Sequence, residues 1–582
     1  MQERTDGAVD LSCSKGNAST NSKIKRVDVC WATEKILLAC CMLFLCVTSI
    51  ATLVCTSTYP DYSGTFMLSF TTTPLVIAVI LLQFAVLYML DRQGILKRIP
   101  VRKIAFALAV YLTMFGVAWA ALADVWPEWD SSAIFDAASE FGVVGSRFYE
   151  PGRYVERFPH QLAYILLVHA VEVTVGHRYV VMECINALAA GLLGYAIVML
   201  TSALFTSRRV ANIAAFLLFG FFPLVFYSTF AYPNMISLAF AAWAMLFQAK
   251  ALIRLREDEG RNGKMAPASC VRQAFTMQSR MYVIRYIAGS ALCAAASYLF
   301  KSSMLLVLVA MVVVWIGYGL RNWRCLARSF VSLGALVALM VCCVAGVSTI
   351  NGYAELRTGI DTSRAMPSSA YIAMGFNHDS NGWYTGFLWS LDEGDETTYD
   401  PARYDEVARQ LIAEEISRMV EQPLDALVFF ATKYCSEWCD PTSESLLASN
   451  WSTSPSDLVM SERAMSPLLK SIYYGPVHQA IVFFLDGWQS LVLISALVAV
   501  LRGWRALNRA DEGIAFTIDR LAPMLYVAGL ALFYVVWEAK AQYTMPGYVM
   551  LVPYAAVGIA YITKRIDTAL LHRGLCRTHS RG

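Results

Sequence analysis

The stretch QLAYILLVHAVEVTVG, residues 161–176, decides how the chain folds, because it sets the side on which every later loop lies. It is apolar over most of its length, but it contains His169 and Glu172. It is also shorter than the ~20 residues that a helix needs to cross a bilayer. The stretch therefore either crosses a membrane as an unusually short helix or lies along one of its surfaces.

The composition is that of a polytopic membrane protein. Of 582 residues, 57% are hydrophobic, 13% are aromatic and only 16% are charged, which excludes an ordinary soluble domain. The 15 cysteines lie mostly in apolar runs and show no zinc-binding spacing. Cys435 and Cys439 could pair, but one helical turn apart their geometry is unfavourable. We expect no nucleic-acid partner.

Twelve apolar runs are long enough to cross a bilayer ~30 Å thick. They lie at 36–57, 73–91, 103–123, 180–205, 210–229, 233–253, 283–300, 302–320, 328–348, 477–502, 521–537 and 541–563.

Charge assigns the sides of these runs. Lys/Arg clusters follow alternate runs, whereas the short loops TSTYPDYSGTF and AYPN carry none. Loops rich in Lys and Arg stay in the cytoplasm, and the alternation holds only if 161–176 does not cross. We therefore predict an interfacial or re-entrant helix there. Twelve spans then leave both termini in the cytoplasm of a multi-pass cell-membrane protein.

The spans divide the chain into six parts. The segment 349–475 has 19 Asp and Glu against 8 Lys and Arg, and helix starts at Asp400-Pro401 and at Pro423. The predicted parts are a disordered cytoplasmic tail (1–35), two additional N-terminal spans (36–102), a membrane core (103–348) with its first outer loop at 124–179, a small, mainly helical extracytoplasmic domain (349–475), three C-terminal spans (476–563) and a basic cytoplasmic tail (564–582). The predicted fold class is an all-α polytopic membrane protein with additional interfacial helices.

The first outer loop opens with WPEWDSSAIFDAASEFG, residues 126–142, in which Asp130 begins an amphipathic helix. Asp130 could simply cap this helix, since Asp is among the best N-cap residues. Alternatively, it is a base at the water–lipid boundary that takes a proton from a hydroxyl. Asp124, Glu128 and Asp136 are nearby competitors, and each is better explained as a solvated surface acid.

Cations near the same surface suit a lipid-linked phosphate. Arg153 and Arg157 lie among aromatic residues, with Arg147, and a guanidinium can bind two phosphate oxygens together. Lys301 lies at the junction of two spans, where an ionisable residue is a functional candidate. Headgroup binding or snorkelling explains each of these cations equally simply.

Further polar residues are candidates for binding a substrate. A mixture of aromatic and hydrogen-bonding groups suits a sugar, although turn chemistry and core packing produce the same mixture. The candidates are His160 and Gln161 at the start of the interfacial helix, Glu538, Lys540 and Tyr543 near the last outer turn, and Trp383 in GFNHDSNGWYTG.

The order of these elements resembles the GT-C membrane glycosyltransferases. An acid after a span, then FPHQLAYILL (158–167) and RRVANIAAFLLFGFFPLVFYSTFAYPN (208–234), is similar to their family-39-like branch, the protein O-mannosyltransferases and aminoarabinose transferases. The later MGFNHDSNGWYTG, ATKYCSEWCDPT and WEAKAQYTMPGY look like bacterial relatives of that branch. The resemblance covers about 103–563 and leaves 1–102 as an N-terminal addition.

The resemblance implies roles for three of these positions. Asp130 takes the place of the family's presumed base, FPHQ stands where a proline motif opens the interfacial helix, and Lys301 stands near a basic residue that meets the donor phosphate. Two positions depart from the family. Ser131 replaces the Glu of an Asp-Glu pair, and Gln542 stands where related sequences often have Arg.

The activity implied is transfer of a sugar from a polyprenyl-phosphate-linked donor to a hydroxyl of a glycan, lipid or protein acceptor on the outer face of the membrane. It would proceed by an inverting mechanism with Asp130 as base. Outer-loop carboxylates could hold a divalent metal, although no ligand spacing requires one, and no cofactor is assigned. The alternatives are a transporter or lipid-linked glycan flippase and a non-catalytic scaffold, but the sequence shows no matched halves of the kind that carriers have.

Overall fold

The computed structural model describes residues 17–59, 66–127, 129–262, 277–323, 325–384, 391, 398–449, 466–509 and 516–579. Ten helices within these ranges are long and apolar enough to cross a membrane, which confirms an all-helical, multi-span fold. They are α1 (Asn17–Val54), α2 (Thr73–Arg92), α4 (Val101–Ala123), α8 (Tyr179–Phe205), α11 (Asn234–Asn262), α12 (Met277–Phe300), α13 (Leu305–Arg321), α14 (Leu326–Thr358), α21 (Pro476–Arg509) and α23 (Ala541–His579).

The predicted count of twelve spans is not reached, because two of the predicted runs form irregular helices. The run 210–229 becomes α9 (Arg208–Phe219), α10 (Pro223–Phe226) and the 3₁₀ turn η2 (Tyr227–Thr229), with a bend of 59° before Pro223. Proline disrupts helical hydrogen bonding, so a break is expected there. The run 521–537 becomes α22 (Ala522–Val536), which is apolar but has only 15 residues. The structure therefore has ten candidate spans, or eleven if the bent pair is one span.

The stretch 161–176 forms the last residue of η1 (Pro159–Gln161) and α7 (Leu162–Val175). At ~1.5 Å per residue, the 14 residues of α7 reach about 21 Å, less than the ~30 Å hydrocarbon core. Helix α7 packs against α5 (Trp129–Ser139), α12 and α14. Its length fits the predicted interfacial placement.

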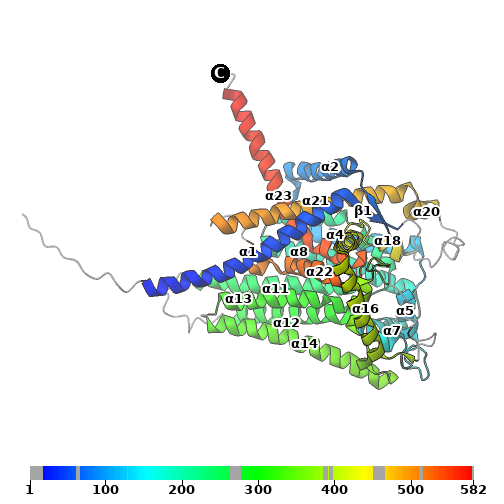
Figure 1. The fold of residues 1–582 in the computed structure, drawn as a ribbon. Coiled ribbons are helices and arrows are strands. Elements are labelled where there is room, and N and C mark those ends of the chain that lie inside the picture. The colour runs from blue at the N-terminus through cyan, green and yellow to red at the C-terminus, as the bar shows by residue number, and fades with distance from the viewer. Residues whose placement is uncertain are drawn as a thin grey trace, which may run out of the picture.

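The N-terminal spans are integral to the bundle. Strands β1 (Cys55–Thr58) and β2 (Met67–Phe70) form an antiparallel hairpin between α1 and α2, with Cys55 opposite Phe70. Both α1 and α2 pack against α21 (Figure 1). The predicted disorder of 1–35 does not hold from Asn17 onward, because α1 extends that far beyond its apolar run; residues 1–16 lie outside the described residues.

The segment 349–475 is mainly helical, as predicted. It contains the end of α14, then α15 (Ser368–Phe376), α16 (Pro401–Glu421), α17 (Pro423–Trp438), α18 (Ser445–Ala448) and α20 (Pro467–Tyr474). The side chain of Asp400 caps α16 by accepting from Ala402 N at 3.0 Å. The remaining short elements are α3 (Ile95–Arg98), α6 (Tyr154–Arg157), η3 (Ser302–Met304), η4 (Thr362–Arg364) and η7 (Ile518–Arg520).

This segment is not wholly separate from the membrane bundle, which differs from the predicted outer domain. The ring of Trp438, at the end of α17, lies 4.9 Å from that of Phe44 in α1 and 5.7 Å from that of Tyr548 in α23. Tyr434 and Thr48 share a hydrogen bond of 2.5 Å. The apolar faces of α17 and of the spans bury each other, so the end of α17 and the turn after it lie among the spans.

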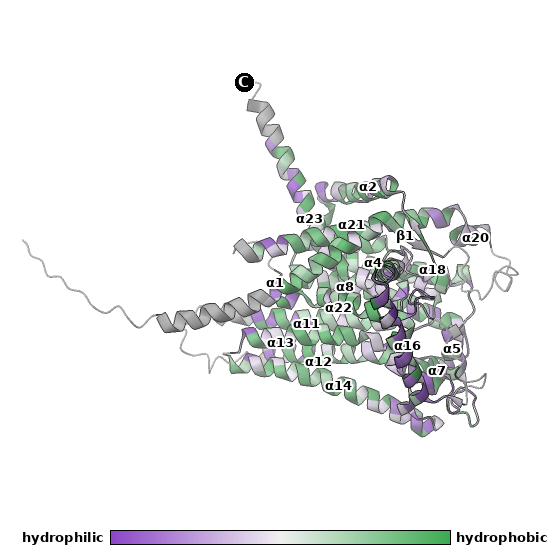
Figure 2. Ribbon diagram, in the orientation of Figure 1, coloured by the Kyte–Doolittle hydropathy of each residue, from purple (hydrophilic) through white to green (hydrophobic). Residues whose placement is uncertain are grey.

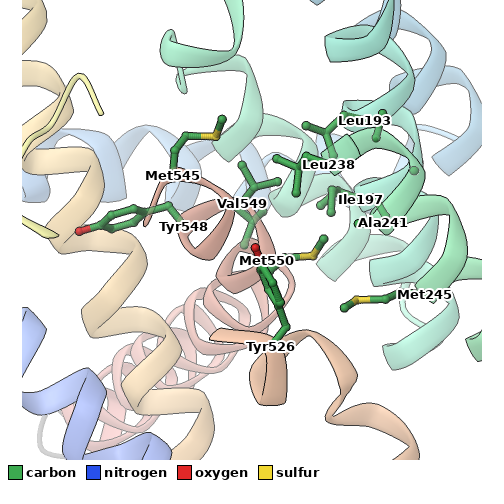
Figure 3. Close-up of a cluster of buried hydrophobic side chains, with 14 of the residues drawn as sticks. Leu193, Ile197, Leu238, Ala241, Met245, Tyr526, Met545, Tyr548, Val549 and Met550 are labelled. Atoms are coloured by element: carbon green, nitrogen blue, oxygen red, sulfur yellow. The ribbon is translucent and has the colours of Figure 1, made fainter. Parts of the chain in front are cut away.

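The core of the bundle surrounds α23. In its most apolar window 89% of residues are buried, more than in any other candidate span described. Figure 3 shows Met545, Val549 and Met550 of α23 beside side chains of α8, α11 and α22. Figure 2 shows hydrophobic residues along α11, α12 and α13, and hydrophilic ones on α16. Helix α23 is therefore the most deeply buried candidate span, whereas α2 and α14, with windows 11% and 17% buried, present apolar side chains outward.

A buried ion pair joins three helices at the end of the bundle opposite α5 and α7. Arg209 of α9 donates from Nε to Asp91 of α2 at 2.7 Å and from Nη2 to the hydroxyl of Thr563 in α23. The Asp91 side chain is 2% exposed. We predict that Asp91→Ala destabilises the protein by ~3–5 kcal/mol, because it leaves the Arg209 charge without its partner. Thermal unfolding in detergent measures the loss.

Glu257→Ala is the matched control. Glu257 pairs with Arg254 at 2.7 Å, but both side chains are about half exposed, and exposed pairs contribute ~0–1 kcal/mol. Equal thermal unfolding midpoints for Asp91→Ala and Glu257→Ala would contradict a stabilising role for the buried pair.

Candidate functional site

Six polar side chains from separate parts of the chain meet at the end of the bundle where α4, α12 and α22 end and α11 and α23 begin. This end lies to the right in Figure 1, near α5, α7 and α18. We call the six side chains the site cluster. They are Asp130 of α5, Tyr154 of α6, Tyr232 between η2 and α11, Lys301 between α12 and η3, and Glu538 and Lys540 between α22 and α23.

Asp130 lies within the first turn of α5, and its carboxylate accepts a hydrogen bond from the Tyr154 hydroxyl. Its side chain is exposed, yet desolvation raises its pKa, while the charges of Lys540 and Lys301 oppose that shift. Water therefore reaches the Asp130 carboxyl, although protein surrounds it on most sides. The contact with Tyr154 and the two lysine charges give Asp130 partners beyond its own helix, which a simple cap does not require.

Lys301 is held in place by a chain of side chains. Its Nζ donates to Asn234 Oδ1, and Asn234 Nδ2 donates to Gln542 Oε1 at 3.0 Å. The ammonium lies 5.5 Å from the ring centre of Tyr232 and 5.1 Å from that of Tyr543. Burial, followed by the charge of Lys540, lowers the pKa of Lys301 to about 7. Lys301 therefore changes charge near neutral pH.

Lys540 stays protonated to a higher pH than Lys301 does. Its Nζ lies 3.3 Å from Glu538 Oε1 and 5.5 Å from the ring centre of Tyr384. Burial acts to lower its pKa, but the charges of Glu538, Glu444 and Asp130 outweigh burial and raise it. Asp130 thus interacts with one lysine that stays protonated and one that titrates.

Glu444 also belongs to this site, although it lies two residues beyond ATKYCSEWCDPT and is not among the predicted site residues. It is 1% exposed, and its Oε1 accepts from Ala541 N at 2.5 Å and from the Tyr59 hydroxyl at 3.1 Å. Burial raises its pKa to about 7, and the charge of Lys540 opposes the shift. Its partners lie 97 and 385 residues away.

A strained turn presents Glu444 to the site. Ser443 and Glu444 have φ angles of 51° and 59°, which residues other than glycine rarely adopt. Asp440 stabilises the turn by accepting from Glu444 N at 2.7 Å and from Thr442 N at 2.8 Å. The Tyr227 hydroxyl donates to the carbonyl of Ser443. Such strain persists only where the surroundings hold it, which is typical of functional sites.

The structure brings His160 and Gln161 to the site cluster. Gln161 Nε2 donates to the Tyr232 hydroxyl at 2.6 Å, and Gln161 is 3% exposed. His160 is exposed, but burial of its ring by surrounding protein, with the charge of Lys301, lowers its pKa to about 4. Like Asp130, His160 is reached by water although protein surrounds it, and its lowered pKa keeps it neutral at neutral pH.

Three predicted binding residues do not join the cluster. Arg157 is 1% exposed, donates from Nε to the carbonyl of Gly152, and lies 4.4 Å from the ring centre of Tyr399. Trp383 is 7% exposed, and its ring lies 5.4 Å from each of the rings of Tyr59 and Phe66. Arg153 pairs with Glu150 at 3.9 Å. Aromatic neighbours in the sequence did not reveal that Arg157 and Trp383 pack inward.

Two competitors of Asp130, Asp124 and Asp136, are described by the structure. Asp124 ends α4 with a φ of 44°, and Asp136 accepts from Ser132 at 3.4 Å; Glu128 lies outside the described residues. Among the described side chains, no group of three or more His, Cys, Asp or Glu is arranged to hold a metal ion.

Comparison with known proteins gives two distant similarities. No family model matches the chain, and no curated protein matches it. It is similar to the oligosaccharyltransferase of Archaeoglobus fulgidus tethered with an acceptor peptide, with 12% identity, a TM-score of 0.36, and coverage of 81% of this chain and 50% of that one. It is also similar to ArnT from Cupriavidus metallidurans bound to undecaprenyl phosphate, with 16% identity, a TM-score of 0.29, and coverage of 77% of each chain. The chain spans about half the length of the oligosaccharyltransferase, and similarities this distant establish no shared family.

The pKa of Lys301 can be tested by chemical labelling. An amine reacts with acylating reagents only when it is neutral, so we predict that labelling of Lys301 reaches half its maximal rate near pH 7. Labelling of Lys540 should rise only at much higher pH, because its pKa is raised. Quantitative mass spectrometry of protein labelled from pH 5 to 10 gives both curves. Coincident curves would show that the surroundings of the two lysines do not distinguish their pKa values.

Proposed function

We propose that the protein is a membrane glycosyltransferase that moves a sugar from a polyprenyl-phosphate-linked donor to an acceptor hydroxyl at the extracytoplasmic end of the bundle. The observation that carries this proposal is the site cluster. It places a desolvated but accessible carboxylate, Asp130, within charge interaction of two lysines at the end of a membrane-spanning bundle.

The distribution of cations supports the proposed orientation. The short helix α3 and the helix ends at the end opposite the site cluster contain Lys97, Arg98, Arg208, Arg209 and Arg321. Because Lys- and Arg-rich loops stay in the cytoplasm, the site cluster faces the other side in this proposal, where a donor lipid anchored in the outer leaflet can reach it.

In the proposed reaction, Asp130 is the general base. It takes the proton of the acceptor hydroxyl as that oxygen attacks the anomeric carbon, and the bond from this carbon to the phosphate oxygen breaks. The phosphate leaves with the bonding electron pair, and a single displacement inverts the anomeric centre. A raised pKa suits Asp130 to this task, because a base is most effective when its pKa approaches the working pH.

The two lysines would neutralise the leaving phosphate. Charge that develops on a leaving group is stabilised most by positive groups fixed in advance, and Lys301 is fixed by its bond to Asn234. Lys540 supplies a charge that persists across neutral pH. We assign the phosphate contacts to these lysines rather than to Arg157, whose guanidinium is enclosed by protein.

Tyrosine rings supply a surface for the sugar. Tyr232 and Tyr543 flank Lys301, and Tyr154 bonds to Asp130. Aromatic faces with a few hydrogen-bonding groups are typical of carbohydrate and other small-ligand sites. His160, neutral and accessible, and Gln161 would add hydrogen bonds to the sugar beside these rings.

A transporter or lipid-linked glycan flippase is the second candidate. The 59° break between α9 and α10 favours it, since discontinuous helices are common in secondary transporters. The two functions differ in one outcome: a transferase consumes a donor and forms a new glycosidic bond, whereas a flippase moves the donor intact across the bilayer.

We predict that Asp130→Asn lowers turnover of a radiolabelled polyprenyl-phosphate sugar by ~10²–10⁴-fold and leaves donor binding intact, because it removes the base without removing the lysines. Transfer is measured in membranes with a panel of donor sugars. Asp136→Asn, which changes an acid in the same helix, should leave turnover unchanged. Normal turnover by Asp130→Asn would contradict the assignment of the base, and donor that moves across the bilayer unreacted would favour the flippase.

We also predict that Lys301→Met weakens binding of the polyprenyl-phosphate donor, because a phosphate contact is lost. Binding to the wild type should weaken as pH rises through about 7, since the lysine then loses its charge. Lys470→Met, an exposed site on α20, is the control. Donor affinity from equilibrium binding in detergent checks both statements. A pH profile that Lys301→Met leaves unaltered would exclude Lys301 from the phosphate site.

A further inference from the structure

Helices α16 and α17 meet at a strip of exposed apolar side chains, which we call the α16–α17 apolar face. The exposed fractions of these residues range from 47% to 78%. The face consists of Ile416, Val420, Leu424, Leu427 and Val428. Exposed apolar residues are common singly, but a contiguous strip of five marks a surface that something covers.

The C-terminal half of α17 contacts two apolar helices of the bundle. Tyr434 hydrogen-bonds to Thr48 of α1 at 2.5 Å. The preceding residue, Lys433, donates from Nζ to the carbonyls of Val535 and Trp537, at the end of α22, at 3.0 and 2.8 Å. The apolar face therefore belongs to a helix that is attached to both α1 and α22.

The flanking helices expose apolar side chains at the same places. In α1, Val47 and Ile50 are 46% and 64% exposed; in α22, Leu532 and Val535 are 75% and 40% exposed. Val47 and Ile50 lie on either side of Thr48, whereas Val535 carries a carbonyl that Lys433 binds and Leu532 lies one helical turn before it. Because α1 is a candidate span, its exposed apolar side chains face the acyl chains. The apolar face of α17 is thus continuous with the lipid-facing surface of the bundle.

The opposite side of α16 is polar, as an interfacial helix requires. Glu414 and Glu421 are exposed, and at 100° per residue they lie on roughly the opposite side from Ile416. Figure 2 shows hydrophilic residues along α16, which runs across the ends of the spans in Figure 1.

We propose that the α16–α17 apolar face inserts into the acyl region of the leaflet at the site end, so that this pair of helices is anchored in the bilayer rather than suspended in water. The proposal goes beyond the proposed function and does not depend on it. Its consequence for the site runs through Lys433, which also donates to Gly375 O at 2.6 Å. Insertion of α17 fixes this lysine, and with it the turn that precedes Glu538 and Lys540.

The test is fluorescence quenching in proteoliposomes of phosphatidylethanolamine and phosphatidylglycerol. A genetically encoded fluorescent amino acid replaces Leu427 in one full-length variant and Val420 in a second, so that a folding failure of one does not end the test. Ile50 of α1 is the lipid-facing reference and Glu414 the water-facing reference. Spin-labelled lipids and aqueous iodide are the two quenchers, and each variant is first shown to be monodisperse.

We expect probes at 427 and 420 to be quenched several-fold more by spin-labelled lipids than the probe at 414, and to be protected from iodide as the probe at 50 is. Quenching by iodide to the level seen at 414 would place the face in water and overturn the proposal. Protection from both quenchers would also overturn it, because protein, such as a second copy of this chain, would then cover the face.

Discussion

The desolvation of five ionisable groups at one end of the bundle is the constraint on which the site depends. Removing a charge from water costs several kcal/mol unless an opposite charge or hydrogen bonds replace the solvent. Lys301 and Lys540 meet this requirement through Asp130, Glu538 and Glu444, and each acid in turn interacts with a lysine or with fixed donors. The positions of these side chains are mutually dependent, so the loops that carry them cannot be placed independently.

The membrane imposes the remaining architecture. Backbone groups within a bilayer must be hydrogen-bonded inside the protein, and the described chain meets this condition with helices in every predicted apolar run. Irregular backbone occurs at the break before Pro223 and in the turn at 439–444, where surrounding helices cover it. Buried side chains such as Tyr227 and Gln489, which donates to Asp440 O at 2.7 Å, complete the hydrogen bonding there.

Hydropathy located the spans because twenty consecutive apolar residues are a local signal, and it located Asp130 and Lys301 because isolated charges are conspicuous in an apolar context. It did not reveal Glu444 or Tyr59, whose roles arise from a contact across 385 residues. The sequence also did not indicate that Arg157 and Trp383 are buried, since neighbours along the chain do not tell whether a side chain points toward a ligand or into the core. Within the described residues the structure has ten candidate spans, or eleven with the bent pair, where about twelve were predicted, because bends and short helices depend on packing.

The bond between Glu444 and the backbone of Ala541 has a consequence for biosynthesis. Ribosomes deliver a chain from its N-terminus at ~5–20 residues per second, so Asp130, Lys301 and Glu444 enter the membrane well before Glu538, Lys540 and the amide of Ala541 exist. Until the last span emerges, the earlier helices hold charges whose partners have not been made. The nascent protein therefore passes through a stage in which its polar centre is open to water, to lipid headgroups or to insertion factors, and the final helix closes it.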